Sequence, residues 1–215
     1  MQPSDSFTNS ALLALSGGLQ DAYTYNIRGH VFANAQTGNV VLMSQSLMTG
    51  DVTTALHFLL PLVSFGLGIL VAEQVQNTFQ THRGIHWRQR ILVLEILILA
   101  SVAFMPSSYD VVANALVSFS CALQVQSFRK VHGYGYASTM CIGNLRSGTE
   151  ALSMYLRTKD TEALTRTFHY YGIIAIFALG AGLGGVLSAI FAEKTILLSP
   201  MILLISFFLM HNFKR

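Results

Sequence analysis

The chain has 215 residues, of which 52% are hydrophobic and 11% are charged, and its formal net charge is +3. Because an average soluble domain is about 25% charged, this composition excludes a typical soluble enzyme. The 13 Lys and Arg residues lie mostly in short connectors between apolar runs, which excludes the clustered basic face of a nucleic-acid-binding protein. The apolar runs reach the length of membrane-spanning helices, about 20 residues, and lack the alternation of barrel strands.

Eight segments follow one another along the chain, at about residues 9–27, 31–48, 55–77, 89–105, 109–128, 134–156, 167–192 and 195–211. The third, fourth, seventh and eighth are strongly apolar. The first is interrupted at Gly17 and Gly18, and it has no basic start, so we expect it to be retained rather than cleaved as a signal peptide. The second and sixth are semi-polar, and we expect half-membrane or broken helices there.

The order of segment types occurs twice. Matching residues lie at nearly constant offsets: Leu19-Gln20 with Leu123-Gln124, Gly38-Asn39 with Gly143-Asn144, and His57, Phe65 and Gly68 with His169, Phe177 and Gly180. The pattern predicts an internal duplication, with repeats at approximately 9–105 and 109–211 of a single membrane domain, residues 1–215. The predicted fold class is all-α, a polytopic membrane helix bundle.

The distribution of positive charge distinguishes two topologies. If all eight segments cross the membrane, the connector Lys and Arg residues divide 7 to 5 between its two sides, without counting Arg146. This small difference does not determine the orientation of the protein. If the second and sixth segments do not cross, 11 of the 13 lie on the side of the two termini, and Arg28 and Lys194 lie on the other. The positive-inside rule favours this six-span topology, with both termini cytoplasmic. Each half then crosses three times, which makes the repeats inverted, a construction typical of secondary transporters.

A charged pair distinguishes the sixth segment from the second. Arg146 and Glu150 are four residues apart and share one helix face, and the repeat places Val41 and Gln45 at the matching positions. Two interpretations are open. The pair is solvated on a cytoplasmic connector, or it belongs to a polar face that lines a cavity between the halves.

The two Gly-Asn pairs also have two interpretations. Gly38-Asn39 and Gly143-Asn144 either open the backbone and present amides to a ligand, or allow helices to pack closely.

Two acidic residues lie inside apolar segments. Asp21 follows the Gly17-Gly18 interruption, and acids within the membrane are functional candidates by default. The alternative is a helix-end residue at the interface. If the inverted halves face one another, Arg146 is the predicted partner of Asp21. Glu95 lies within the fourth segment, where we expect a structural role through snorkelling or pairing.

The residues predicted to bind a solute or ion are polar or small and lie within the membrane segments. They are Gln20, Asp21, Asn34, Thr37, Gly38, Asn39, Gln124, Gly143, Asn144, Arg146 and Glu150. No catalytic residue, metal site or cofactor is predicted, because no nucleophile, phosphate-loop or zinc motif is found. His82 and His86 are four apart but sit in a basic connector, and Cys121 and Cys141 have no metal-ligand spacing, so we expect free thiols.

The stretch GGLQDAYTYNIRGHVFANAQTGNVV, residues 17–41, resembles the YoaK-type family of bacterial membrane proteins. The resemblance extends through the second Gly-Asn pair and the Phe- and Gly-rich seventh segment. It implies a small multi-pass protein of the inner membrane, in contact with the lipid bilayer. It implies no substrate.

The sequence therefore supports two main functional hypotheses. The first is a transporter or channel-like protein that binds an unknown small solute or ion between its halves. The alternative is a non-transporting membrane component, an assembly factor or sensor that acts through protein partners. A membrane-embedded enzyme is the weakest hypothesis, no nucleic-acid partner is expected, and the sequence leaves homo-oligomerisation open.

Overall fold

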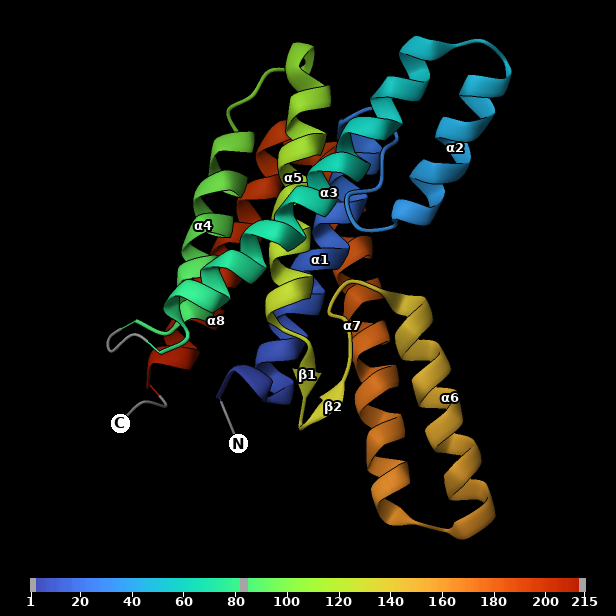
Figure 1. Ribbon diagram of the computed structural model, residues 1–215, viewed down its shortest axis with the longest axis vertical. Coiled ribbons are helices and arrows are strands. Elements are labelled where there is room, and N and C mark those ends of the chain that lie inside the picture. Colours follow the sequence, from blue (N-terminus) through green and yellow to red (C-terminus); the bar gives the residue numbers. More distant parts are fainter. Residues whose placement is uncertain (1–2, 82–84, 213–215) are drawn as a thin grey trace.

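The computed structural model describes residues 3–81 and 85–212, and almost all of its regular structure is helical (Figure 1). The first half holds η1 (Pro3–Asp5), α1 (Phe7–Ile27), α2 (Gln36–Met48), α3 (Val52–Phe79) and α4 (Trp87–Val102). The second half holds η2 (Ser107–Tyr109), α5 (Asp110–Ser127), β1 (Lys130–Val131), β2 (Tyr134–Gly135), α6 (Cys141–Thr158), α7 (Thr161–Phe191), η3 (Ala192–Leu197) and α8 (Leu198–Asn212). Arg83, Lys214 and Arg215 of the charge count, and His82, lie outside the described residues.

The helices form a bundle with α2 (13 residues) and α6 (18 residues) at its side, each about half as long as the helix on which it packs, α3 (28 residues) or α7 (31 residues). α1 packs along α7, and α3 packs along α5, in the two most extensive contacts of the bundle, while α4 lies against α5 and α8. The half-length helices α2 and α6 pack on α3 and α7 and extend in opposite directions, upward and downward in Figure 1. α1 begins and α8 ends at the same end of the bundle. The all-α prediction is confirmed, with one two-stranded hairpin, in which Lys130 pairs with Gly135, added between α5 and α6.

The predicted interruption of the first segment is wrong, because α1 continues through Gly17 and Gly18. These glycines serve close packing instead. A Cβ atom on Gly18 would overlap the backbone oxygen of Phe177 in α7, and one on Gly180 would overlap the backbone oxygen of Leu15 in α1. The side chains are absent because α1 and α7 approach each other backbone to backbone, as small-residue contacts between membrane helices allow.

The bundle has a polar interior and an apolar exterior. Buried polar side chains are frequent, for example Gln20, Asn114 and Gln124, while large apolar side chains such as Leu70 and Val186 are exposed. Two helical stretches of the described chain are long and apolar enough to cross a membrane by length and composition, Val52–Phe79 and Thr161–Met210, the second of which runs from α7 into α8. An exterior that water would penalise is the expected surface of a protein in lipid.

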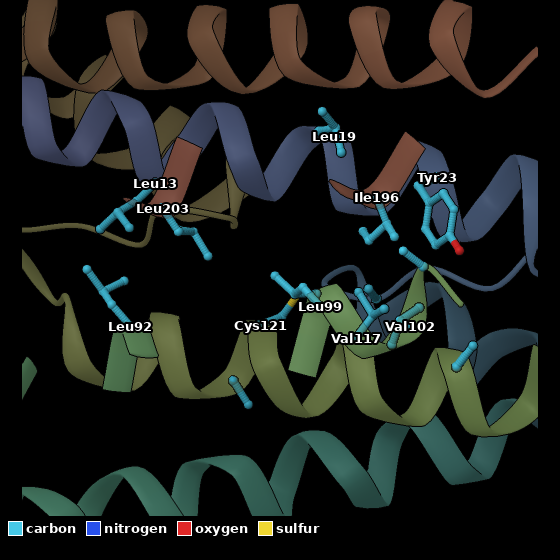
Figure 2. Packing of buried hydrophobic residues seen from close by; sticks show 14 of the residues in the cluster. Leu13, Leu19, Tyr23, Leu92, Leu99, Val102, Val117, Cys121, Ile196 and Leu203 are labelled. Carbon is cyan, nitrogen blue, oxygen red and sulfur yellow. The ribbon is translucent and has the colours of Figure 1, made fainter. Parts of the chain in front are cut away.

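The apolar part of the core lies where α1, α4, α5, η3 and α8 meet (Figure 2). Leu13 and Leu203 face Leu92 at one level, and Leu99, Val117 and Cys121 interdigitate at the next, as Figure 2 shows. Lipid tails are as apolar as these side chains, so in a bilayer the contacts stabilise the bundle through close packing rather than through escape from water.

The two basic residues at the end of the bundle opposite the termini are engaged in the fold. Arg28 is fully buried and donates to the carbonyls of Val102 (3.1 Å) and Met105 (2.9 Å) at the end of α4, and to Asp110 Oδ1 (2.7 Å). Lys194 donates to the carbonyl of Ala103 (3.0 Å). Both cations thus satisfy carbonyls that the end of α4 leaves without helical partners.

Candidate functional site

The two half-length helices begin in the same way. Before each helix the chain is irregular, and an asparagine of the first helical turn holds that segment in place. Asn39 accepts from the N–H of Phe32 (3.3 Å) and donates to its carbonyl (2.7 Å). Asn144 makes the same two bonds, of 3.3 and 2.7 Å, with the N–H and carbonyl of Ala137. Each amide thereby replaces a backbone pairing that the irregular segment lacks.

The beginnings of α2 and α6 open into one cavity of about 600 Å³. Its polar lining consists of Asp21, Asn34, Gln36, Thr37, Thr139 and Cys141, and its apolar lining of Ala35, Leu62, Phe65, Gly66, Met140, Ile142 and Phe177. Five helices, α1, α2, α3, α6 and α7, and both irregular segments contribute. A mostly apolar cavity of this size with a few convergent polar groups is typical of a small-molecule site.

Asp21 is the acidic residue of the cavity lining, and it is 7% exposed. Its Oδ1 accepts from the backbone N–H of Asn34 at 2.8 Å, so the carboxylate is fixed against the irregular segment before α2. The Asn34 amide donates from Nδ2 to the carbonyl of Gly17 at 3.2 Å. This bond joins the same segment to α1, one helical turn before Asp21, and fixes the position of the carboxylate from both sides.

Two buried polar atoms in residues of the lining have no hydrogen-bond partner among the described residues. They are Asn34 Oδ1 and Thr139 Oγ1, and their side chains are 3% and 5% exposed. The two residues occupy matching positions in the repeat, one before α2 and one before α6. A buried polar atom without a partner costs free energy, about 1–3 kcal/mol, which a bound ligand would recover.

The helix ends that face this cavity have no side-chain caps. α2 begins after Ala35 and α6 begins after Met140, and neither residue makes a capping hydrogen bond. By contrast, Ser6, Asp51 and Asp160 cap α1, α3 and α7 with their side chains. The amides of the first turns of α2 and α6 therefore give the cavity two regions of partial positive charge.

Several predicted site residues lie beside the cavity rather than on it. Gln20 is buried among Ser16, Ser199 and Cys121, with three bonds of 2.9 Å. Gln124 donates to the carbonyl of Leu13 (3.2 Å) and to Ser138 Oγ (2.8 Å). Both glutamines connect helices in the interior.

The Gly-Asn pairs do not open the backbone, because α2 and α6 are continuous there. Gly38 lies against the Phe32 ring, with 3.4 Å from a built Cβ to the ring. Gly143 and Asn144 line a smaller cavity of about 410 Å³ beside α6. The asparagines hold the irregular segments beside the cavity, and the predicted opening of the backbone at these pairs is wrong.

The charged pair of α6 is not where a ligand site requires it. Arg146 and Glu150 are both exposed, and they form no ion pair with each other. The prediction that Arg146 balances Asp21 is also wrong, because Arg146 is not among the residues that line the cavity of Asp21. The exposed face of α6 matches the alternative interpretation of a solvated pair.

Sequence reasoning left out of the binding site several residues that the structure brings to Asp21, among them Thr139, Phe65 and Phe177. The repeat contained the signal for all three. Thr139 matches Asn34, and Phe65 matches Phe177. A search for residues related by the repeat, rather than for polar residues alone, would have found them.

Comparisons with known proteins show the family of the chain and support its membrane class. The family model described as "Protein of unknown function (DUF1275)" matches residues 10–209, which include every helix that lines the cavity. The chain is 27% identical over 177 residues to the UPF0700 transmembrane protein YoaK of Bacillus subtilis (strain 168), covering 80% of this chain and 79% of that protein. No solved structure matches the chain. The relative is a transmembrane protein by name, in agreement with the apolar exterior of the bundle.

Proposed function

The chain belongs to the DUF1275 family of YoaK-like membrane proteins, as residues 17–41 indicated, and on that premise we propose that it is a small transporter or channel-like protein. Its ligand binds in the cavity that Asp21 lines between α2 and α6. The observation that carries the proposal is the meeting of two uncapped helix beginnings and a buried carboxylate in one cavity. Helix beginnings that face a buried cavity also form the binding sites of many secondary transporters.

The proposal includes two inverted halves, residues 9–105 and 109–211. Support comes from matched contacts: α1 on α7 corresponds to α3 on α5, and the Asn39 brace corresponds to the Asn144 brace. Gly180 meets the carbonyl of Leu15 just as Gly68 meets that of Phe119. Such pairs of equal contacts are what a duplicated chain in opposite orientations would make.

We further propose six crossings of the bacterial inner membrane, with both termini in the cytoplasm. α2 and α6 each begin beside the cavity and are about half as long as α3 and α7, on which they pack, so we count α1, α3 and α4 as the crossings of the first half and α5, α7 and α8 as those of the second. Arg28 and Lys194, the two cations on the other side, are bound to the end of α4 and are not free to anchor in a cytoplasmic surface. Their engagement strengthens the positive-inside assignment. Reporter fusions after residues 50 and 107 should be active outside, and fusions after residues 84 and 215 inside. A cytoplasmic signal at residue 50 would contradict six crossings.

The natural cysteines provide a test of access to the cavity. Cys141 lines the cavity and Cys121 is fully buried. A charged, membrane-impermeant methanethiosulfonate should label Cys141 from both faces of oriented vesicles, because a transporter or channel opens its site to both sides. Cys141→Ala should remove the labelling and serves as the control for Cys121. Labelling from neither face would refute a solute pathway and favour the non-transporting component.

Asp21→Asn tests the role of the carboxylate. It keeps the shape and the acceptor for the Asn34 N–H, so the protein should fold and still be labelled at Cys141. Ligand-induced stabilisation and flux in proteoliposomes should be lost. Full activity of Asp21→Asn would place the site elsewhere.

A further inference from the structure

We propose that the cavity binds a small zwitterion with an apolar body, whose ammonium pairs with Asp21 and whose carboxylate lies at the beginning of α6. The inference rests on the proposed function, because it takes the cavity as the ligand site. It adds the chemical class of the ligand and its orientation.

The two ends of the cavity differ in charge although their backbones match. At the α2 end, the Asp21 carboxylate accepts the N–H of Asn34, two residues before α2 begins, so a negative group already lies near the positive end of this helix. At the α6 end the repeat places Val125 where the first half has Asp21, and no side chain caps the helix. The α6 end therefore lacks the carboxylate that the α2 end possesses, and a ligand carboxylate would supply it.

The ammonium is assigned from the acceptors near Asp21. Asn34 Oδ1 has no partner among the described residues, and it is fixed as an acceptor because Nδ2 of the same amide donates to Gly17. Together with the Asp21 carboxylate it requires a donor from the ligand. Among the described residues that line the cavity, none is Lys, Arg or His, so a ligand ammonium would meet no competing positive side chain beside the Asp21 carboxylate.

The remaining lining excludes ligands of a single charge type. A simple anion would face Asp21 without a compensating cation, and a simple cation would leave the α6 amides and Thr139 Oγ1 unpaired. A zwitterion satisfies both ends and carries no net charge into a low-dielectric site. Its apolar body lies against Phe65, Phe177 and Ile142, which come from three helices around the cavity.

Three probes with the same branched carbon body test the assignment. L-Leucine carries both charges, 3-methylbutylamine lacks the carboxylate, and 4-methylpentanoate lacks the ammonium. We expect leucine to raise the Tm of the purified full-length protein and to bind about tenfold or more tighter than either single-charge probe, because each lost charged contact is worth at least about that factor. Labelled leucine should also exchange across proteoliposomes.

Variants locate the two ends. Asp21→Asn should weaken the binding of leucine about tenfold or more. The binding of 4-methylpentanoate should stay unchanged or become tighter, because the charge that repels its carboxylate is gone. Thr139→Val should weaken the binding of leucine and of 4-methylpentanoate to a similar extent, and the binding of 3-methylbutylamine should not change. Asp51→Asn removes an exposed carboxylate at the start of α3, outside the cavity, and should change none of the three.

The outcomes separate this inference from the proposed function. If the amine binds as tightly as leucine, the cavity selects simple cations, and if the acid does, it selects simple anions. Either result overturns the assignment of a zwitterionic ligand. If no probe binds while Cys141 is labelled from both faces, the ligand class is wrong and the solute pathway stands. If Cys141 is reached from neither face, the proposed function fails as well.

Discussion

The region from Gly17 to Asn39 and the region from Cys121 to Asn144 have the same scaffold and different chemistry. In both, an asparagine in the first turn of a helix holds the irregular chain just before it with bonds of 3.3 and 2.7 Å, although the β1–β2 hairpin precedes that chain in the second region alone. The buried carboxylate occurs in the first region alone, where Asp21 stands opposite Val125 of the second. The matched asparagine hydrogen bonds therefore belong to the packing of both halves, whereas the Asp21 carboxylate belongs to the cavity between them.

The largest effect should come from the glycines that make the scaffold compact. Gly180→Ala places a Cβ on the backbone oxygen of Leu15, and Gly68→Ala places one 2.5 Å from that of Phe119, so both force helices apart. We expect each to lower the free energy of unfolding by about 3 kcal/mol, the upper part of the range for overpacking. The measurement is denaturation of the purified protein in mixed micelles.

Gly182→Ala is the matched control on the same helix, since nothing lies within 4 Å of its built Cβ. It should stabilise α7 by up to about 1 kcal/mol, because alanine is the better helix former. If Gly180→Ala behaves like Gly182→Ala, α1 and α7 are not in backbone contact.

The asparagine braces should be of equal importance in the two regions. Asn39→Ala leaves the N–H and carbonyl of Phe32 without partners, and Asn144→Ala does the same at Ala137. We expect each to cost about 2 kcal/mol in the same unfolding assay. If one of the two variants lowers the free energy of unfolding and the other does not, the matching hydrogen bonds do not contribute equally to stability in the two regions.

Glu95 provides the contrast to Asp21. It is fully buried, both of its carboxylate oxygens lack a partner among the described residues, and it does not line the cavity. The expected snorkelling or pairing is thus wrong.

Glu95→Met fills the same space without a polar group, and we expect it to stabilise the protein by about 1 kcal/mol and to leave leucine binding unchanged. Glu95→Gln keeps a buried polar group and should therefore stabilise the protein less than Glu95→Met does. Destabilisation by Met would reveal a partner for this carboxyl.

The smallest effect concerns Asp51, an exposed acid at the turn between α2 and α3. Hydrogen bonds from the Thr54 hydroxyl and from the Thr54 backbone N–H lower the pKa of Asp51 below its ordinary value of 3.8. A lowered folded-state pKa stabilises the protein above the unfolded value, and this contribution is lost as the pH falls through the folded value.

Wild type should therefore be slightly more stable than Asp51→Ala near pH 6, and the difference should shrink below about pH 4. Thermal unfolding across that range measures it. If the difference in stability between wild type and Asp51→Ala grows as the pH falls, the Asp51 carboxylate does not stabilise the start of α3.

Much of the fold follows from the sequence alone. Apolar runs define most helices, and the semi-polar second and sixth segments form α2 and α6, which begin at the cavity after irregular chain. Polar groups and irregular backbone persist in lipid only where protein or water satisfies them. Asp21 was identified from the cost of an acid in an apolar segment, and it does line the main cavity.

The tertiary structure decided which groups face one another. Gly17 and Gly18 read as a helix break because glycine favours one locally, but the close approach of α7 makes them a contact surface inside a continuous helix. Arg146 is exposed and does not line the cavity of Asp21, whereas Thr139 and Phe177 join Asp21 there from more than 100 positions along the chain. Local periodicity reports whether a residue prefers lipid, water or protein, whereas its partner depends on helix contacts that no single segment contains.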